Sequence, residues 1–217
     1  QQQLNDFHQQ HQQLDFEQYK NFLTEIGYLQ PQPDDFQIDS TNVDAEIATV
    51  AGPQLVVPVK NARYALNAVN ARWGSLYDAL YATDVIDEQN GAEKGNNYNP
   101  VRGQKVVVYG RQLLNEFIPL QSTSWQQVTG FNIEGNTLRL LTAENSCELA
   151  NGQQFVGYQG TETQPSTLLF VHNKLHLIVE IDAEHTIGKS DPAYIKDIKL
   201  EAAITTIMDC EDSVAAV

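Results

Sequence analysis

The fold class is decided by the stretch Gly52-Pro53-Gln54-Leu55-Val56-Val57-Pro58-Val59. This short apolar run, rich in β-branched residues, is typical of a strand that is buried on both faces. Between residues 61 and 81 the apolar side chains recur every three or four positions, which predicts one long helix. They are Ala62, Ala65, Leu66, Val69, Trp73, Leu76 and Leu80. A buried strand followed directly by a long helix predicts the first half of a βα unit.

A second buried strand is predicted at residues 204–208, close to the end of the sequence. Before it, Asp191 and Pro192 have the residue types that favour an N-cap and a first helical position. An apolar stripe with helical spacing follows at Ile195, Ile198 and Ala202. We therefore expect a helix that begins near Pro192, and after it a return to the βα framework.

The sequence between the two strands predicts mainly antiparallel structure. Turn residues at the centres of residues 126–141 and 167–181 predict two β-hairpins, and residues 155–158 predict a further short strand. Residues 100–117 predict a helix or a strand–helix boundary. At the other end of the chain, residues 1–26 predict two short helices that end at Gly27. Pro31 and Pro33 then begin an irregular acidic connection.

These patterns predict an α/β (α+β) fold in four parts. Residues 1–50 form a helical segment and linker, and residues 51–82 form the first strand and helix. Residues 83–190 form an inserted α/β domain rich in antiparallel strands, and residues 191–217 return to the framework. We expect residues 106–181 to hold the fold, while the flanking elements re-pack or associate between chains because two parallel strands leave edges and apolar faces open.

Composition excludes several classes of function. The 217 residues include 13 Lys+Arg and 28 Asp+Glu, which gives a formal net charge of −15. Nucleic acids and anionic membranes need clustered cations, so neither is an expected partner. The sequence has no run of about 20 apolar residues and no signal peptide. Its two cysteines make no disulfide framework, which favours the cytoplasm. The lack of an initiator Met and the apolar run at residues 213–217 favour a piece of a longer protein.

Candidate chemistry lies where the last strand ends. Strand alternation puts Asp209 and Glu211 on one side and Asp212 on the other. Carboxylates at the carboxyl end of a parallel strand lie where α/β folds bind their ligands. Arg63, near the start of the predicted helix, could meet an anionic ligand, and Tyr64 offers a flat ring. The alternatives are a solvated loop for the carboxylates and an ordinary helix surface for Arg63. The five histidines show no metal-ligand spacing.

Residues 52–81 closely resemble malate synthase G, and so do residues 191–193 and 201–217. The resemblance implies a TIM barrel with an N-terminal helical clasp, an inserted α/β domain and a C-terminal helical domain. Residues 51–82 and 191–217 would then be incomplete TIM-barrel segments around the insert. Members of this family condense acetyl-CoA with glyoxylate and water to give malate and CoA. They use Mg²⁺ and act in the glyoxylate cycle.

The resemblance also implies roles for single residues. It places acetyl-CoA contacts at Val56, Arg63, Tyr64 and Ser213. It places Asp209 and Glu211 near the Mg²⁺–glyoxylate pocket, where they bind waters on the metal. The catalytic base and the direct metal ligands of the family lie downstream, so this chain alone is expected to be inactive and to hold no bound cofactor. The parent enzyme is expected to be a monomer, whereas this chain is expected to self-associate through its open strands. The alternative is a non-catalytic binding or interaction module built on the inserted domain.

Overall fold

The computed structural model describes residues 1–11 and 13–210, and Glu211 and Ser213 therefore lie outside it. The chain divides into two compact units, Gln1–Asn42 and Val43–Val217. No helix in the described ranges is long and apolar enough to cross a membrane.

The first unit contains two short helices, α1 (Gln2–Gln10) and α2 (Phe16–Glu25), as predicted. The ring of Phe7 in α1 stacks on the ring of Phe22 in α2 with their centroids 4.1 Å apart. Asp15 caps α2, because its side chain accepts a hydrogen bond from the backbone N–H of Gln18. A small aromatic contact therefore joins the two helices.

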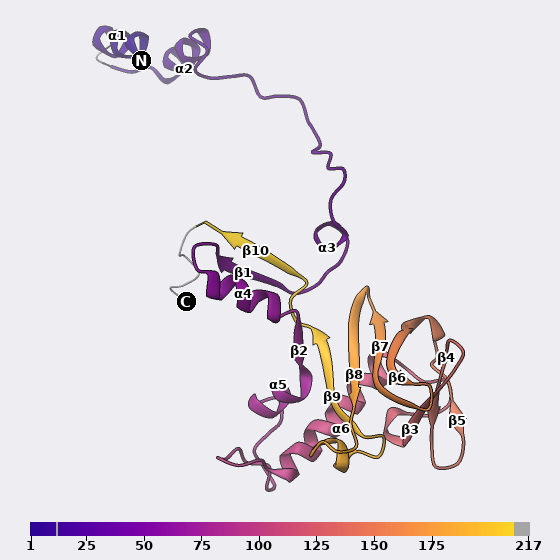
Figure 1. Cartoon of the computed structure of the whole chain (residues 1–217). Helices are drawn as coiled ribbons and strands as arrows, with labels where there is room; N and C mark the ends of the chain where they lie inside the picture. The colour runs from indigo at the N-terminus through magenta and orange to yellow at the C-terminus, as the bar shows by residue number, and fades with distance from the viewer. Residues whose placement is uncertain (12, 211–217) are drawn as a thin grey trace. The chain divides into compact units, whose positions relative to one another are not determined.

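The second unit opens with the short helix α3 (Ala45–Ala48) and then a βα unit. Strand β1 (Gln54–Pro58) pairs in parallel with β10 (Thr205–Asp209), and helix α4 (Ala62–Asn70) packs beside them (Figure 1). The prediction that the first strand is buried on both faces was wrong. Val57 is buried but Val56 is 43% exposed, because no described element covers the outer face of this two-stranded sheet.

Besides the β1–β10 pair, the second unit contains a five-stranded antiparallel sheet and a three-stranded one. The larger sheet has the order β2 (Trp73–Ser75), β9 (Ile195–Glu201), β8 (Leu175–Ile181), β7 (Gln164–His172) and β6 (Phe155–Thr161). The smaller sheet has the order β3 (Gly130–Glu134), β4 (Thr137–Leu141) and β5 (Ser146–Cys147). The fold is thus mixed α/β with antiparallel sheets, and the two predicted hairpins are confirmed.

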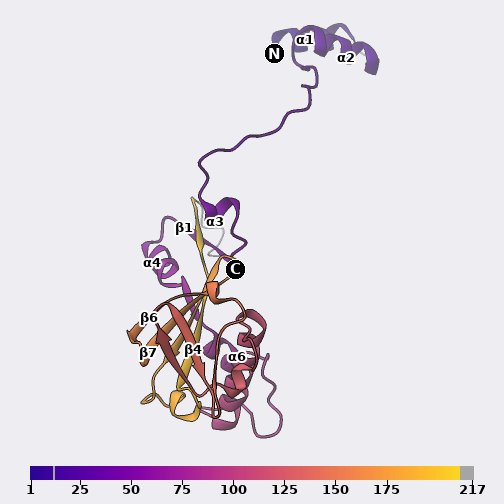
Figure 2. The ribbon, with the colours of Figure 1, turned by 90° about the vertical axis from the view of Figure 1, so that its right-hand side faces the viewer.

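Helix α6 (Pro100–Phe117) covers one side of these strands (Figure 2). Its first turn is fixed by Asn99, whose side chain accepts from the N–H groups of Val101 and Arg102, with Pro100 in the first helical position. The largest apolar side chains of the shared core include Leu114 from α6, Phe170 from β7 and Trp125 from the 3₁₀ turn η1 (Trp125–Gln127). Two further 3₁₀ turns are η2 (Gly152–Gln154) and η3 (Gly188–Ser190). Most members of this core lie between residues 106 and 181.

The prediction of one long helix over residues 61–81 was wrong, because a short strand divides this segment into two helices. After α4, the strand β2 pairs with β9, and α5 (Leu76–Ala82) then begins a new helix. Ser75 caps α5 by accepting from the backbone N–H of Asp78. Glycine at position 74 allows β2 to lie close to the residue that follows β9, since a Cβ atom there would lie only 3.0 Å from Cβ of Ala202.

The helix predicted near Pro192 was also wrong, because residues 195–201 form strand β9. Burial recurs there at every third residue, at Ile195, Ile198 and Glu201. The three-residue spacing of Ile195 and Ile198 imitates a helix because a register shift in the β8–β9 pairing adds one residue to β9 between them. Asp191 does not cap a helix; it is buried and closes a turn instead.

Candidate functional site

The parallel pair β1–β10 brings the carboxyl ends of two strands together. Pro58 pairs with Asp209, and the backbone N–H of Val59 donates to the carbonyl oxygen of Asp209 over 2.8 Å. Helix α4 begins only a few residues after β1, so its N-terminus lies at the same end of the unit as Asp209 (Figure 1). Ligands of α/β folds bind at this end of the strands.

The first turn of α4 presents an exposed cation next to an aromatic ring. The side chain of Asn61 accepts from the backbone N–H of Arg63 over 3.1 Å and so caps the helix. The guanidinium carbon of Arg63 lies 5.6 Å from the ring centroid of Tyr64, and both side chains are exposed. No carboxylate among the described residues forms an ion pair with Arg63, so the guanidinium is available to an anion from solution.

An apolar surface adjoins this turn. Val56 on β1 pairs with Ile207 on β10, and the two side chains are 43% and 45% exposed. Val59, Leu66, Val69 and Met208 in the same unit are exposed as well. Ile207 and Met208 are neighbours on one strand and therefore point to opposite faces, so both faces of the β1–β10 pair leave apolar side chains exposed. Exposed apolar side chains on strands with open edges favour contact with further protein or a ligand.

The structure thus places four of the six predicted site residues in one unit: Val56, Arg63, Tyr64 and Asp209. The other two, Glu211 and Ser213, lie outside the described residues. Within the described ranges, no group of three His, Cys, Asp or Glu side chains could hold a metal ion. The ligand roles of all six residues stay predictions.

A buried carboxylate fastens the junction between the β1–β10 pair and the larger sheet. Oε1 of Glu201 accepts from Nη2 of Arg72 over 2.6 Å, and its Oε2 accepts from the backbone N–H of His176 over 2.7 Å. The N–H of Ala202 donates to the carbonyl of Arg72 over 2.8 Å. Burial alone raises the pKa of Glu201, but the His176 N–H and the Arg72 guanidinium outweigh it and lower the pKa.

A second buried ion pair joins α6 to the entry of β9. Nε and Nη2 of Arg111 donate to the two carboxylate oxygens of Asp191 over 2.8 and 2.6 Å. Nη1 of Arg111 donates to the carbonyl oxygens of Trp125 and Val128. Four of the five guanidinium N–H donors thus have partners inside the protein, which marks Arg111 as a structural residue.

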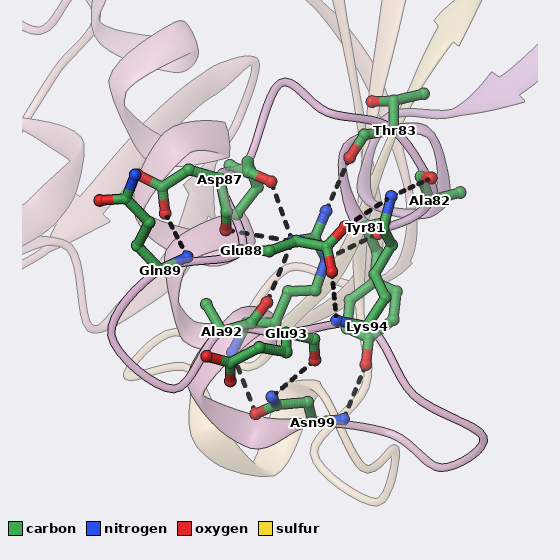
Figure 3. Close-up of polar contacts among 12 residues, drawn as sticks. Tyr81, Ala82, Thr83, Asp87, Glu88, Gln89, Ala92, Glu93, Lys94 and Asn99 are labelled. Atoms are coloured by element: carbon green, nitrogen blue, oxygen red, sulfur yellow. Dashed lines mark hydrogen bonds and ion pairs between the residues drawn. The ribbon is translucent and has the colours of Figure 1, made fainter.

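A third buried arginine organises the loop between α5 and α6. The Arg102 side chain is fully buried and donates only to backbone carbonyls. Figure 3 labels several of the acceptor residues, among them Tyr81, Thr83 and Asp87. The acceptors belong to Tyr81, Thr83, Ile86, Asp87 and Ala92. Sequence reasoning missed these three clusters, because their members are far apart in sequence or read as ordinary charges on a helix surface. The S-x-x-D spacing of Ser75 and Asp78 was a usable signal for the start of α5.

Comparison with known proteins agrees with the resemblance seen in the sequence. Residues 98–172 match the family described as malate synthase G, alpha-beta insertion domain. Malate synthase G of Halalkalibacterium halodurans is 54% identical over 206 residues, which are 94% of this chain and 28% of that protein. The enzyme of the same name from Corynebacterium glutamicum is 50% identical over 99% of this chain and 29% of its own length. That of Corynebacterium efficiens is 51% identical over 94% of the chain and 27% of its length.

The chain therefore spans less than a third of the relatives that it matches, while nearly all of its own length is matched. The matched segment includes the β1–α4–β10 unit as well as the inserted sheets. Over the segment that it spans, the chain belongs to the malate synthase G family.

Proposed function

We propose that this chain is the part of a malate synthase that carries the inserted domain and begins the acetyl-CoA site. The whole enzyme condenses acetyl-CoA with glyoxylate and water to give malate and CoA in the cytoplasm, and the chain by itself is inactive. One observation carries this proposal. The exposed guanidinium of Arg63, the ring of Tyr64 and the carboxyl end of β10 lie at the same end of a parallel βα unit.

Each of these groups suits one part of CoA. The Arg63 guanidinium at a capped helix N-terminus can hold a phosphate, and the Tyr64 ring can lie against the adenine. Val56, half exposed on β1, supplies an apolar contact. Ser213 would complete the set from the segment that follows β10. Mg²⁺ is assigned to the whole enzyme, and no step of this proposal depends on it.

The architecture around this site is proposed to be a TIM barrel. The parallel pairing of β1 with β10 and their open outer edges support this, because a barrel needs a further strand on each side. The helices of the first unit would be the clasp of the enzyme. Without the remaining strands, the apolar faces of β1, α4 and β10 give the isolated chain a reason to self-associate, whereas the whole enzyme would be monomeric.

Two assays test the proposal. Malate formation is measured for the 217-residue chain and for a chain extended to the length of its relatives, and only the extended chain should be active. CoA binding to the 217-residue chain is then measured by calorimetry. Arg63→Ala should weaken it, whereas Arg139→Ala, a cation on β4, should not. Inactivity of the extended chain would favour a non-catalytic interaction module, and equal CoA binding by both variants would refute the site at α4.

A further inference from the structure

A cleft of about 440 Å³ lies between α5, α6, strands β8 and β9 and the β8–β9 connection. None of its lining residues belongs to β1, α4 or β10, so it is distinct from the proposed CoA site. Its volume falls within the usual range for small-molecule pockets, about 300–1,000 Å³. Five charged side chains line it: Asp78, Glu180, Lys196, Asp197 and Lys199.

The two carboxylate oxygens of Asp197 differ in their hydrogen bonds. Its Oδ1 accepts from the Oγ–H of Ser75 over 2.9 Å, from the N–H of Tyr77 over 3.3 Å and from its neighbour Ile198 N–H over 2.8 Å. No described residue donates a hydrogen bond to its Oδ2. Burial raises the pKa of Asp197 even though these three donors act to lower it. A partly buried carboxylate in this state favours an added cation or donor.

Lys196 reaches the same cleft only because of the β-bulge between β8 and β9. Glu180 pairs with Asp197 and Ile181 with Ile195, which leaves Lys196 as the extra residue. In a regular strand, Lys196 and Asp197 would point to opposite faces of the sheet. The bulge brings both to one cleft, and bulges commonly redirect a side chain in this way next to binding sites.

The ammonium of Lys196 is only loosely held. Its Nζ lies 3.7 Å from Glu180 and 3.9 Å from Asp182, beyond hydrogen-bond length. Lys199, in contrast, lies 2.7 Å from Glu180 and neutralises it. Lys196 is therefore the more weakly paired of the two lysines, and Asp197 is the carboxylate with an oxygen that accepts no hydrogen bond from a described residue. The exposed carboxylate of Asp78 adds to the anionic side.

Apolar groups complete the walls of the cleft. The rings of Tyr81 and Tyr98 stack with their centroids 5.6 Å apart, and both residues line the cleft together with Val106 and Ile187. A ligand that fits these walls has an apolar body and carries one positive and one negative group.

We propose that this cleft binds a zwitterionic α-amino acid with an apolar side chain. The ammonium group of the ligand hydrogen-bonds to Oδ2 of Asp197, and its carboxylate pairs with Lys196. The apolar side chain lies against Val106, Ile187 and the tyrosine rings. Binding of this kind gives this part of the chain a ligand of its own, apart from acetyl-CoA and glyoxylate.

The test is a titration of the 217-residue chain with L-phenylalanine, followed by amide NMR shifts. Shifts centred on residues of the cleft are expected. Phenethylamine, which lacks the carboxylate, and 3-phenylpropionate, which lacks the ammonium, should each bind at least about tenfold more weakly. No shift of cleft residues with L-phenylalanine up to about 10 mM, or equal binding of all three compounds, would overturn the proposal.

Two variants assign the contacts. Asp197→Asn should weaken the binding of L-phenylalanine at least about tenfold but leave the affinity for 3-phenylpropionate unchanged. Its amide oxygen can still accept hydrogen bonds from Ser75 and Tyr77. Lys196→Gln should weaken the binding of L-phenylalanine by a similar factor and leave the affinity for phenethylamine unchanged. This substitution removes no hydrogen bond of the fold. Lys189→Gln, an exposed lysine outside the cleft, is the control. Unchanged affinity in Lys196→Gln would contradict the assignment even if Asp197→Asn failed to fold.

Discussion

Removal of the Asp191 carboxylate is expected to cost more stability than any exposed charge on this chain. The Arg111 and Asp191 side chains are 4% and 0% exposed, and they meet through two hydrogen bonds. Asp191→Ala leaves the Arg111 charge buried without its partner, and breaking a buried pair from one side typically costs about 3–5 kcal/mol. Such a loss is a large fraction of the stability of an ordinary domain, about 5–15 kcal/mol.

A second cost adds to the first. Oδ1 of Asp191 also accepts from the backbone N–H groups of Ala193 and Ile195, over 2.8 and 3.1 Å. Leaving a buried donor unpaired costs about 1–3 kcal/mol. The two costs are not strictly additive, so we expect a total loss of at least about 4 kcal/mol for Asp191→Ala. Asp191→Asn should lose less, because its amide oxygen still serves the two N–H groups.

Urea unfolding measures this loss, with the fluorescence of the buried Trp125 and far-UV circular dichroism as parallel signals. The control is Arg139→Ala, which removes a partly exposed arginine that pairs with Glu134 and Glu148, and only a small change is expected there. A loss below about 1 kcal/mol for Asp191→Ala would refute the reasoning. If the alanine variant does not fold, an asparagine variant as stable as the parent chain would refute it equally.

Three further predictions follow from single contacts. Because the pKa of Glu201 is lowered in the folded chain, the carboxylate stabilises the fold above the ordinary glutamate pKa of 4.5, and this stabilisation is lost as the pH falls through the lowered pKa. Glu201→Gln should therefore lose less stability in acid than the parent chain, as measured by unfolding curves between pH 6 and pH 3. Tyr77→Phe should leave stability unchanged or raise it by about 1 kcal/mol in a thermal melt, because its buried hydroxyl has no hydrogen-bond partner among the described residues; a clear loss would reveal a partner. Gly188→Ala should cost about 1–3 kcal/mol in urea unfolding, because its Cβ would collide with the backbone carbonyl of Asp182, whereas Gly95→Ala, with open space around it, should stay within about 0.5 kcal/mol of the parent chain; equal effects would contradict this packing.

Sequence patterns correctly predicted those elements whose signals are local in the sequence. The hairpins β3–β4 and β7–β8 have turn residues between alternating strands, and both were predicted. For residues 100–117 the sequence left a helix and a strand–helix boundary open, and the structure has helix α6 there. In the second hairpin, Asn173 and Lys174 both take positive φ, which the tight turn requires. Local chemistry is enough for such elements, because no distant contact is needed to choose between helix and strand.

The errors arose where a distant partner decided the structure. The segment Trp73-Gly74-Ser75 continues the apolar helical period, yet it becomes a strand because β9 pairs with it. Ile195 and Ile198 have helical spacing only because a bulge adds Lys196 to the strand, and nothing local in the sequence marks a bulge. Strand pairing therefore overrode the local period in both places, over more than a hundred residues for β2–β9 and through the bulge with the neighbouring strand for β8–β9.

The candidate site shows the same division. Arg63 and Tyr64 could be placed at a helix start from the sequence, and the structure adds that the carboxyl end of β10 lies at that end of the unit. The cleft lined by Lys196 and Asp197 could not be predicted, since strand alternation assigns these two neighbours to opposite faces. Buried pairs such as Arg111–Asp191, 80 residues apart, likewise leave no local signal.

The most direct test of the account is the steady-state rate of malate formation by a chain extended to the length of its relatives, with and without Arg63→Ala. We predict that the extended parent chain converts acetyl-CoA and glyoxylate to malate, and that Arg63→Ala raises the KM for acetyl-CoA while the KM for glyoxylate stays the same. Absence of malate formation, or a KM for acetyl-CoA that Arg63→Ala leaves unchanged, would contradict the assignment of the β1–α4–β10 unit to the acetyl-CoA site.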